Sequence, residues 1–145
     1  MNNRYEMTNT ITPAEYMSMR KAVEWGEFPL EQAQAGLDNS YVWCFRDEGR
    51  PVAVGRVIWD HGYVIYIADI IVIPEYQGQG LGRELMEQVM AFIRSELKPG
   101  YKFMVSLSAA KGKEDFYKKF GFNVRPNDDV GPGMYQWFSN EGENS

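Results

Sequence analysis

The stretch Gln77-Gly78-Gln79-Gly80-Leu81-Gly82 joins a long apolar run, residues 63–73, to a segment with helical periodicity. The run is rich in β-branched residues and predicts a strand that is covered on both faces. The helix after it is predicted by apolar residues at helical spacing, which are Leu81, Leu85, Val89, Phe92 and Ile93. A helix N-terminus offers free N–H groups and the positive end of the helix dipole, so this junction predicts an anion site.

The glycine run does not match the two common nucleotide-binding loops. A dinucleotide-binding fingerprint needs glycine or alanine where this chain has Arg83, and a first strand that opens a βαβ unit. A P-loop needs Gly-Lys-Ser/Thr, which Gly82-Arg83-Glu84 does not provide. A tight turn without a ligand is the remaining alternative, but three glycines in five residues favour close approach of a phosphate to the main chain.

The rest of the chain predicts a mixed α/β fold. Thr12, Pro13 and Glu15 form a capping-box pattern for a first helix that runs to about Trp25. A shorter helix follows, and one precedes Gly121. Strands are predicted before the first helix and at residues 41–45, 52–59, 63–73, 102–106, 122–124 and 134–138. We expect one domain over residues 1–139, with a mostly antiparallel sheet of six to seven strands, about four helices, and a disordered tail at 140–145.

Composition and charge narrow the class of protein. The chain has 145 residues and a net charge of −5, which argues against nucleic-acid and anionic-membrane binding. The single cysteine, Cys44, and the single histidine, His61, leave no disulfide and predict no metal site. The sequence shows neither a leader pattern nor an apolar stretch long enough to span a membrane, so we expect a cytoplasmic protein.

Two separated motifs carry a family resemblance. Gln77-x-x-Gly80-x-Gly82, which follows Ile71-Val72-Ile73-Pro74, resembles the acetyl-CoA signature of the GNAT superfamily of N-acetyltransferases. The later stretch Phe116-Tyr117-Lys118-Lys119-Phe120-Gly121-Phe122 is similar to the family's aromatic-Tyr motif. Residues 68–72, 76–82, 115–122 and 133–134 are further similar to the small arylamine or arylalkylamine acetyltransferase branch.

The resemblance implies that acetyl-CoA is the cosubstrate. Its pyrophosphate would lie against the main chain of Gln77, Gly78, Gln79, Gly80, Leu81 and Gly82, with Arg83 as a nearby cation. Main-chain groups near Ile71, Val72 and Ile73 would pair with the pantetheine arm. An acidic protein would thereby bind a polyanion through oriented backbone dipoles and a single local cation.

The resemblance also implies roles in catalysis. Tyr117 matches the family's tyrosine that protonates the departing CoA thiolate; otherwise it is an aromatic core residue. Asp69 lies in an apolar strand, where a carboxylate must be paired or face a cleft. It therefore serves either as the general base or in a structural or substrate-binding role. His61 is a candidate base but is most simply an exposed turn residue, and Cys44 is a candidate thiol nucleophile but is most simply a small core residue.

Acceptor binding is expected from Glu24, Trp25 and Met134. The Glu24 carboxylate would attract a cationic amine, and Trp25, Tyr41, Trp43 and Met134 would form an apolar wall. Glu24 and Glu27 are alternatively solvated carboxylates at a helix end. The expected function is transfer of acetyl from acetyl-CoA to a small aryl or alkyl primary amine in a ternary complex. The alternatives are a peptide or protein N-terminal or lysine acetyltransferase and a non-catalytic acyl-CoA-binding module. The predicted edge strand near residues 134–138 favours a homodimer.

Overall fold

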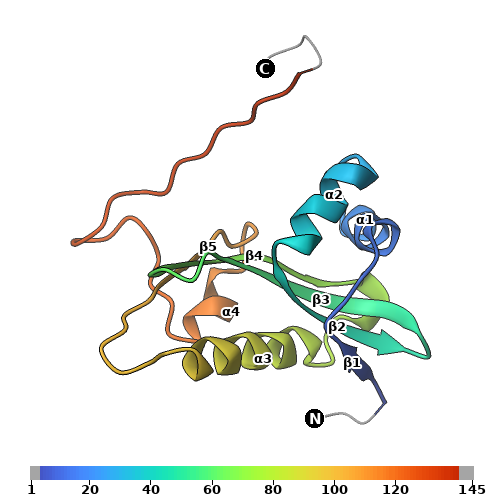
Figure 1. Cartoon of the computed structure of the whole chain (residues 1–145), viewed down its shortest axis with the longest axis horizontal. Coiled ribbons are helices and arrows are strands. Elements are labelled where there is room, and N and C mark those ends of the chain that lie inside the picture. The colour runs from blue at the N-terminus through green and yellow to red at the C-terminus, as the bar shows by residue number, and fades with distance from the viewer. Residues whose placement is uncertain (1–3, 141–145) are drawn as a thin grey trace. The chain divides into compact units, whose positions relative to one another are not determined.

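The computed structural model describes residues 4–140. The chain divides into two compact parts, which meet in sequence between Ser108 and Ala109. The first part contains β1 (Glu6–Thr8), α1 (Pro13–Ala22), α2 (Leu30–Asp38), β2 (Tyr41–Asp47), β3 (Arg50–Trp59), β4 (Val64–Val72), the 3-10 turn η1 (Pro74–Tyr76), α3 (Leu81–Ser95) and β5 (Met104–Leu107) (Figure 1). The second part contains α4 (Glu114–Lys118).

A five-stranded sheet forms the centre of the first part, with its strands in the order β1-β2-β3-β4-β5. All neighbours are antiparallel except β4 and β5, which are parallel. The helices α1 and α2 lie on one side of the sheet and α3 on the other (Figure 1). Arg56 pairs with Asp69 and Val57 with Ile67, so Ala68 is one extra residue in β4. Such a bulge redirects the side chain beside it.

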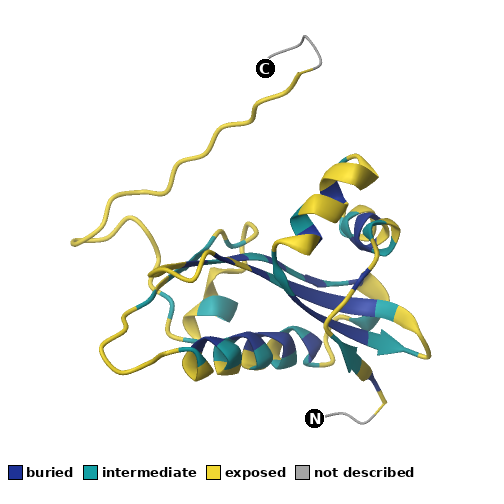
Figure 2. Ribbon diagram, in the orientation of Figure 1, coloured by how far each residue is buried: buried dark blue, intermediate teal, exposed yellow. Residues whose placement is uncertain are grey.

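The predicted helix signals are confirmed in the first part. Thr12 caps α1, and the Thr12 and Glu15 side chains bond reciprocally to each other's backbone N–H. The helix ends at Ala22, three residues earlier than predicted, and Glu24 has a φ of 64° that no α-helix accommodates. The buried stripe of α3 is Leu81, Leu85, Met86, Val89 and Ile93. Figure 2 shows the buried residues concentrated where this helix and the sheet face each other.

The prediction of six to seven strands is wrong for residues 4–140, in which five strands form. Residues 122–124 and 134–138 have an apolar, β-type sequence but belong to no sheet. Met134 and Phe138 are 92% and 86% exposed. Hydrophobic pattern indicates which side chains could pack, whereas a strand also requires a neighbouring backbone to bond with. Most of the predicted tail, residues 141–145, lies outside the described residues.

Candidate functional site

The junction of β4 and α3 carries a row of free main-chain donors. The first helical bond of α3 runs from the Glu84 N–H to the Gly80 carbonyl, and none of the N–H groups of residues 78–83 donates to an acceptor within residues 4–140. Gly80 is the N-cap in the left-handed conformation, with a φ of 87°, and it provides no side-chain cap. The Arg83 guanidinium lies over it, 3.3 Å from where a Cβ would stand. The junction therefore combines unpaired donors, a helix dipole and a cation.

Side chains on both sides of the loop hold it in place. The Gln77 amide donates to the Val72 carbonyl at 2.9 Å, which ties the loop back to the end of β4. The Tyr5 hydroxyl donates to Gln79 Oε1 at 2.7 Å, and the Tyr76 hydroxyl donates to Asp47 Oδ2 at 2.6 Å. Hydrogen bonds thus anchor the loop to the residue before β1, to β2 and to β4.

Beyond Ile67, the edge of β4 that faces away from β3 pairs with no other strand in residues 4–140. The parallel pairing with β5 stops at Ile67 and Leu107, whereas β4 continues to Val72. Ile71 and Ile73 are buried at 2% and 3% exposure, so their side chains belong to the core. The main chain of Ile73 is also engaged, because its N–H donates to the Val52 carbonyl at 3.0 Å and its carbonyl accepts from the Tyr76 N–H at 2.9 Å. The role of these residues toward a ligand stays a prediction.

Asp69 lies at the centre of a buried polar cluster. Its Oδ2 accepts hydrogen bonds from the Tyr16 hydroxyl and from Arg56 Nε, the latter at 2.8 Å. Its Oδ1 accepts from Arg20 Nη1 at 3.3 Å. Arg56 Nη1 also donates to Ser40 Oγ at 3.0 Å. The cluster joins α1, β3, β4 and the end of α2.

Burial and charge shift the pKa values in this cluster. Burial, together with the nearby Asp69 carboxylate, raises the pKa of the Tyr16 phenol, so this hydroxyl stays protonated and donates. Burial would lower the pKa of Arg56, but the hydrogen bond and charge of Asp69 raise it above the ordinary value. Tyr16 and Arg56 therefore both act as donors, and Asp69 Oδ2 accepts a hydrogen bond from each of them.

The second part of the chain carries two of the predicted site residues. Tyr117 lies on α4, half-buried, and its ring is 4.9 Å from the Phe116 ring and 6.5 Å from the Phe122 ring. Met134 is exposed in the irregular segment beyond α4. Phe116 and Phe120 also contact each other, at 5.5 Å between ring centroids. The aromatic-Tyr motif thus forms a small aromatic group around Tyr117.

Comparison with known proteins identifies the family. The model of the acetyltransferase (GNAT) domain matches residues 38–124, which is more than half of the chain and includes both the loop and α4. The chain belongs to the GNAT superfamily. A probable acetyltransferase of unknown function from meticillin-resistant Staphylococcus aureus has a solved structure that is 33% identical. It superposes with a TM-score of 0.82 over 92% of this chain and 99% of that chain, so the fold is GNAT-like.

Two plant relatives of this GNAT chain have functional names. Histone acetyltransferase TAP1 of Glycine max is 31% identical over 81% of this chain and 53% of its own length. Serotonin N-acetyltransferase 2, chloroplastic, of Oryza sativa is 31% identical over 73% of this chain and 54% of its own length. The chain therefore spans about half the length of these curated relatives. The cytoplasmic location stays a prediction; no helix in residues 4–140 is long and apolar enough to cross a membrane.

The residues expected to form an acceptor wall in this GNAT chain lie in different places. Trp25 follows α1, and its ring is 5.5 Å from the Arg20 guanidinium carbon. Tyr41 and Trp43 instead contact Phe92 of α3, at 4.7 and 5.4 Å between ring centroids. Since α1 and α3 cover opposite sides of the sheet, Trp25 does not share a wall with that aromatic pair. Glu24 is exposed, and it forms no ion pair with any residue in 4–140.

The two residues considered as nucleophile or base have ordinary structural environments. Cys44 is fully buried, and burial raises the pKa of its thiol to about 11, so the thiol stays protonated at neutral pH. His61 lies in the predicted turn with a φ of 75°, and its Nε2 is 3.1 Å from the Tyr41 hydroxyl. Both environments agree with the simpler of the interpretations made from the sequence.

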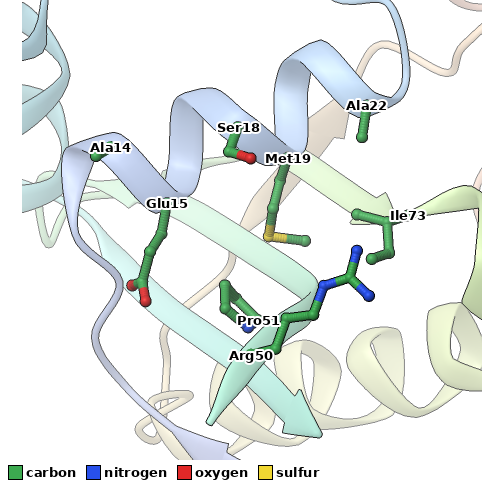
Figure 3. A pocket seen from close by; sticks show the side chains of 8 residues that line it. All are labelled: Ala14, Glu15, Ser18, Met19, Ala22, Arg50, Pro51 and Ile73. Carbon is green, nitrogen blue, oxygen red and sulfur yellow. The ribbon is translucent and has the colours of Figure 1, made fainter.

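A pocket between α1 and the sheet was not predicted from the sequence. It has a volume of about 320 Å³ and is lined by Ala14, Glu15, Ser18, Met19, Ala22, Arg50, Pro51 and Ile73 (Figure 3). Three small residues at a spacing of four, Ala14, Ser18 and Ala22, turn one stripe of α1 toward it. That spacing is visible in the sequence, but small helical residues alone do not distinguish a pocket from close packing.

Proposed function

We propose that this GNAT domain transfers an acetyl group from acetyl-CoA to the primary amine of a small molecule, directly within a ternary complex. The observation that carries the proposal is the row of unpaired N–H groups at residues 78–83, beside Arg83 and ahead of α3. A diphosphate fits these donors, because anionic oxygens form strong charge-assisted bonds with backbone N–H groups at a helix N-terminus. Family membership supports the same cosubstrate.

Groups on β4 and, on the support of family membership, Tyr117 have proposed roles toward the remainder of this ligand. The main-chain groups of β4 beyond Ile67 that face away from β3 have no strand partner in residues 4–140 and would pair with the amides of the pantetheine arm. Acetyl-CoA would supply an acyl group activated as a thioester. Tyr117 would donate a proton to the leaving sulfur, since a phenol retains its proton at neutral pH and hydrogen bonds well.

The contacts of Asp69 favour the structural alternative over the general-base alternative. A base must present a free lone pair to the amine or to a water molecule. The Asp69 carboxylate accepts three hydrogen bonds, from Tyr16, Arg20 and Arg56, and its residue is only 6% exposed. We therefore propose that solvent water accepts the proton from the amine. Asp69 would instead position the residues near the acceptor.

The names of two relatives support the proposed class of acceptor. The relative named serotonin N-acetyltransferase is a precedent for an arylalkylamine acceptor on a similar chain. The relative named histone acetyltransferase supports a protein acceptor as a second candidate. A panel of arylamines, alkylamines and a lysine-containing histone peptide, assayed by release of free thiol from acetyl-CoA, separates these candidates. Absence of turnover above hydrolysis with every acceptor would contradict the proposed activity.

Binding of CoA is tested independently by Gly80→Asp. Gly80 has a φ of 87°, and a carboxylate there would stand beside the proposed diphosphate. We expect calorimetry to show at least about a tenfold loss of CoA affinity, because charge-assisted hydrogen bonds are worth roughly 1.5–3 kcal/mol each. Gly100→Asp is the matched control, since Gly100 has a φ of 85° in a surface turn. Unchanged CoA affinity in Gly80→Asp with a folded protein would refute the loop assignment.

A further inference from the structure

The cluster around Asp69 contains more positive than negative charge. Two guanidinium groups, Arg20 and Arg56, surround a single carboxylate, and their side chains are only 12% and 17% exposed. The third member, Tyr16, is a neutral phenol that donates to the same carboxylate. A net charge of one positive unit is therefore held in a largely buried place, which is costly unless an anion offsets it.

Each arginine keeps one terminal nitrogen without a protein partner. Arg20 donates from Nε to the Gly26 carbonyl at 2.7 Å and from Nη1 to Asp69, while Arg56 donates from Nε to Asp69 and from Nη1 to Ser40. Neither Nη2 has an acceptor within residues 4–140. No buried side-chain nitrogen or oxygen there lacks a hydrogen bond, so both Nη2 groups reach the surface. They are available to a ligand.

The neighbouring acidic residues do not neutralise this charge. Glu24 and Glu27, in the segment between α1 and α2, are both exposed and pair with neither arginine. The groups that pack against Arg20 from that segment are aromatic, with Trp25 at 5.5 Å and Phe28 at 4.9 Å from the guanidinium carbon to the ring centroid. These rings stabilise a cation but supply no acceptor for its N–H groups.

The position of the cluster relates it to the proposed acyl transfer. Asp69 follows the bulge at Ala68, at the start of the β4 stretch whose edge lacks a partner. The same strand leads, four residues later, into the loop that begins with η1. An acceptor that reaches this stretch of β4 from the side of α1 and α2 would therefore meet the cluster and the aromatic rings of Trp25 and Phe28.

We propose that Arg20 and Arg56 bind a carboxylate of the acceptor. The preferred acceptor is then a primary amine that also carries an aromatic ring and a carboxylate, as an aromatic amino acid does. The inference rests on the proposed function and specifies its substrate. Guanidinium groups are suited to carboxylates because their planar N–H donors match both oxygens. The two free Nη2 groups would supply the donors, and the aromatic rings would contact the substrate's ring.

Three related compounds test the charge of the acceptor directly. Phenylalanine and phenethylamine differ only by the carboxylate, and 3-phenylpropionate keeps the carboxylate but lacks the amine. We expect kcat/KM for phenylalanine to exceed that for phenethylamine by about 10–100-fold, which is the range for hydrogen bonds to a charged group. We also expect 3-phenylpropionate to inhibit competitively against the acceptor. Equal kcat/KM for the two amines, or a preference for phenethylamine, would overturn the proposal.

Arg20→Gln tests the residue itself. It should lower the ratio of the two kcat/KM values toward one, mainly through the KM for phenylalanine. Arg20→Lys keeps the charge but loses the planar set of N–H donors, and it should retain part of the preference. Arg46→Gln is the matched control, because Arg46 of β2 is buried to a similar extent and pairs with Glu15 instead. An unchanged ratio in Arg20→Gln, or an equal loss in Arg46→Gln, would contradict the role of Arg20.

A binding measurement separates this inference from the proposed activity. Calorimetric titration of the CoA-saturated protein with 3-phenylpropionate reports carboxylate binding without any turnover. Binding of 3-phenylpropionate by the wild type and its loss in Arg20→Gln would support the carboxylate site, whether or not the amines are acetylated. A lack of acetylation of both amines would count against the proposed activity but not against this site. Turnover of amines without binding of 3-phenylpropionate would retain the activity and reject the site.

Discussion

At the scale of single residues, the surroundings of Tyr117 and Asp69 suit them to different roles in the proposed reaction. Tyr117 lies among aromatic rings on α4 and is half-buried, so its hydroxyl is the polar end of an otherwise apolar group. Both oxygens of Asp69 accept hydrogen bonds, from Tyr16 and from two arginines, which suits this carboxylate to a positioning role. The position of Tyr117 within the matched GNAT region favours it as the proposed catalytic group.

Substitution of Tyr117 by phenylalanine tests this assignment. We expect kcat to fall by a factor on the order of 10²–10⁴, the usual contribution of a general acid, while the KM for acetyl-CoA changes little. The steady-state rate of thiol release measures both values. Tyr63→Phe removes an exposed hydroxyl from a turn and should leave the rate unchanged. A full rate in Tyr117→Phe would mean that the leaving thiolate takes its proton from elsewhere.

At the scale of elements, an ion pair joins α1 to the sheet. Both terminal nitrogens of Arg46 in β2 donate to Glu15 in the first turn of α1, at 3.0 and 3.1 Å. The hydrogen bond from Arg46, together with the bond from the Thr12 backbone, holds the pKa of Glu15 down to about 2. A depressed carboxyl pKa means that ionised Glu15 stabilises the folded state above its ordinary pKa of 4.5. That contribution is lost as the pH falls from about 4.5 toward 2.

The pH dependence of Glu15→Gln follows from this shift. At pH 7 the variant should be less stable than the wild type by about 1 kcal/mol, a value reduced for a partly exposed pair. The difference in unfolding free energy should shrink as the pH falls from 4.5 toward 2, because the carboxylate of the unfolded wild type then binds a proton while that of the folded state is still ionised. Urea unfolding at several pH values measures it. Glu87→Gln, at an exposed position of α3, should show no comparable trend.

The elements of the first part could be predicted because their signals are local. Three examples are the Thr12–Glu15 capping box, the turn of the β2–β3 hairpin and the glycine run before α3. Each of these signals is formed by residues that are close together in the sequence. The partners of Asp69 could not be predicted, because Arg20 and Arg56 approach from 49 and 13 residues away. A carboxylate in an apolar strand needs a partner, but the sequence does not show which residue provides it. The missing strands failed for a similar reason, since pairing depends on distant backbone.

At the scale of the whole molecule, the acidic charge and the exposed apolar segment have opposite effects on the association of two copies. A net charge of −5 opposes close approach of two copies at low salt. Met134, Tyr135 and Phe138 nevertheless expose large apolar surfaces, and such surfaces commonly mark sites of protein association. The homodimer predicted from the sequence remains compatible with this balance.

Sedimentation velocity tests the predicted homodimer. We expect the wild type to sediment as a dimer, with a larger dimer fraction at higher salt because repulsion is screened. Phe138→Lys and Met134→Lys should shift the protein toward the monomer, since each adds positive charge and polarity to the apolar segment. Tyr63→Lys changes a residue that is 66% exposed in the first part and should not alter the distribution. A monomeric wild type at all salt concentrations would contradict the prediction.

The anchoring of the loop before α3 also affects how the cosubstrate would bind. Hydrogen bonds from Tyr5, Tyr76 and Gln77 hold the loop to the residue before β1, to β2 and to β4. Less conformational entropy would then be lost on binding, so more of the interaction energy appears as affinity. A substitution at Tyr5 would weaken cosubstrate binding, although Tyr5 is 74 residues away from Gln79 in sequence and lies just before the three-residue strand β1. Engineering that perturbs the backbone around Tyr5 would therefore reduce the affinity for the cosubstrate without changing any residue of the loop.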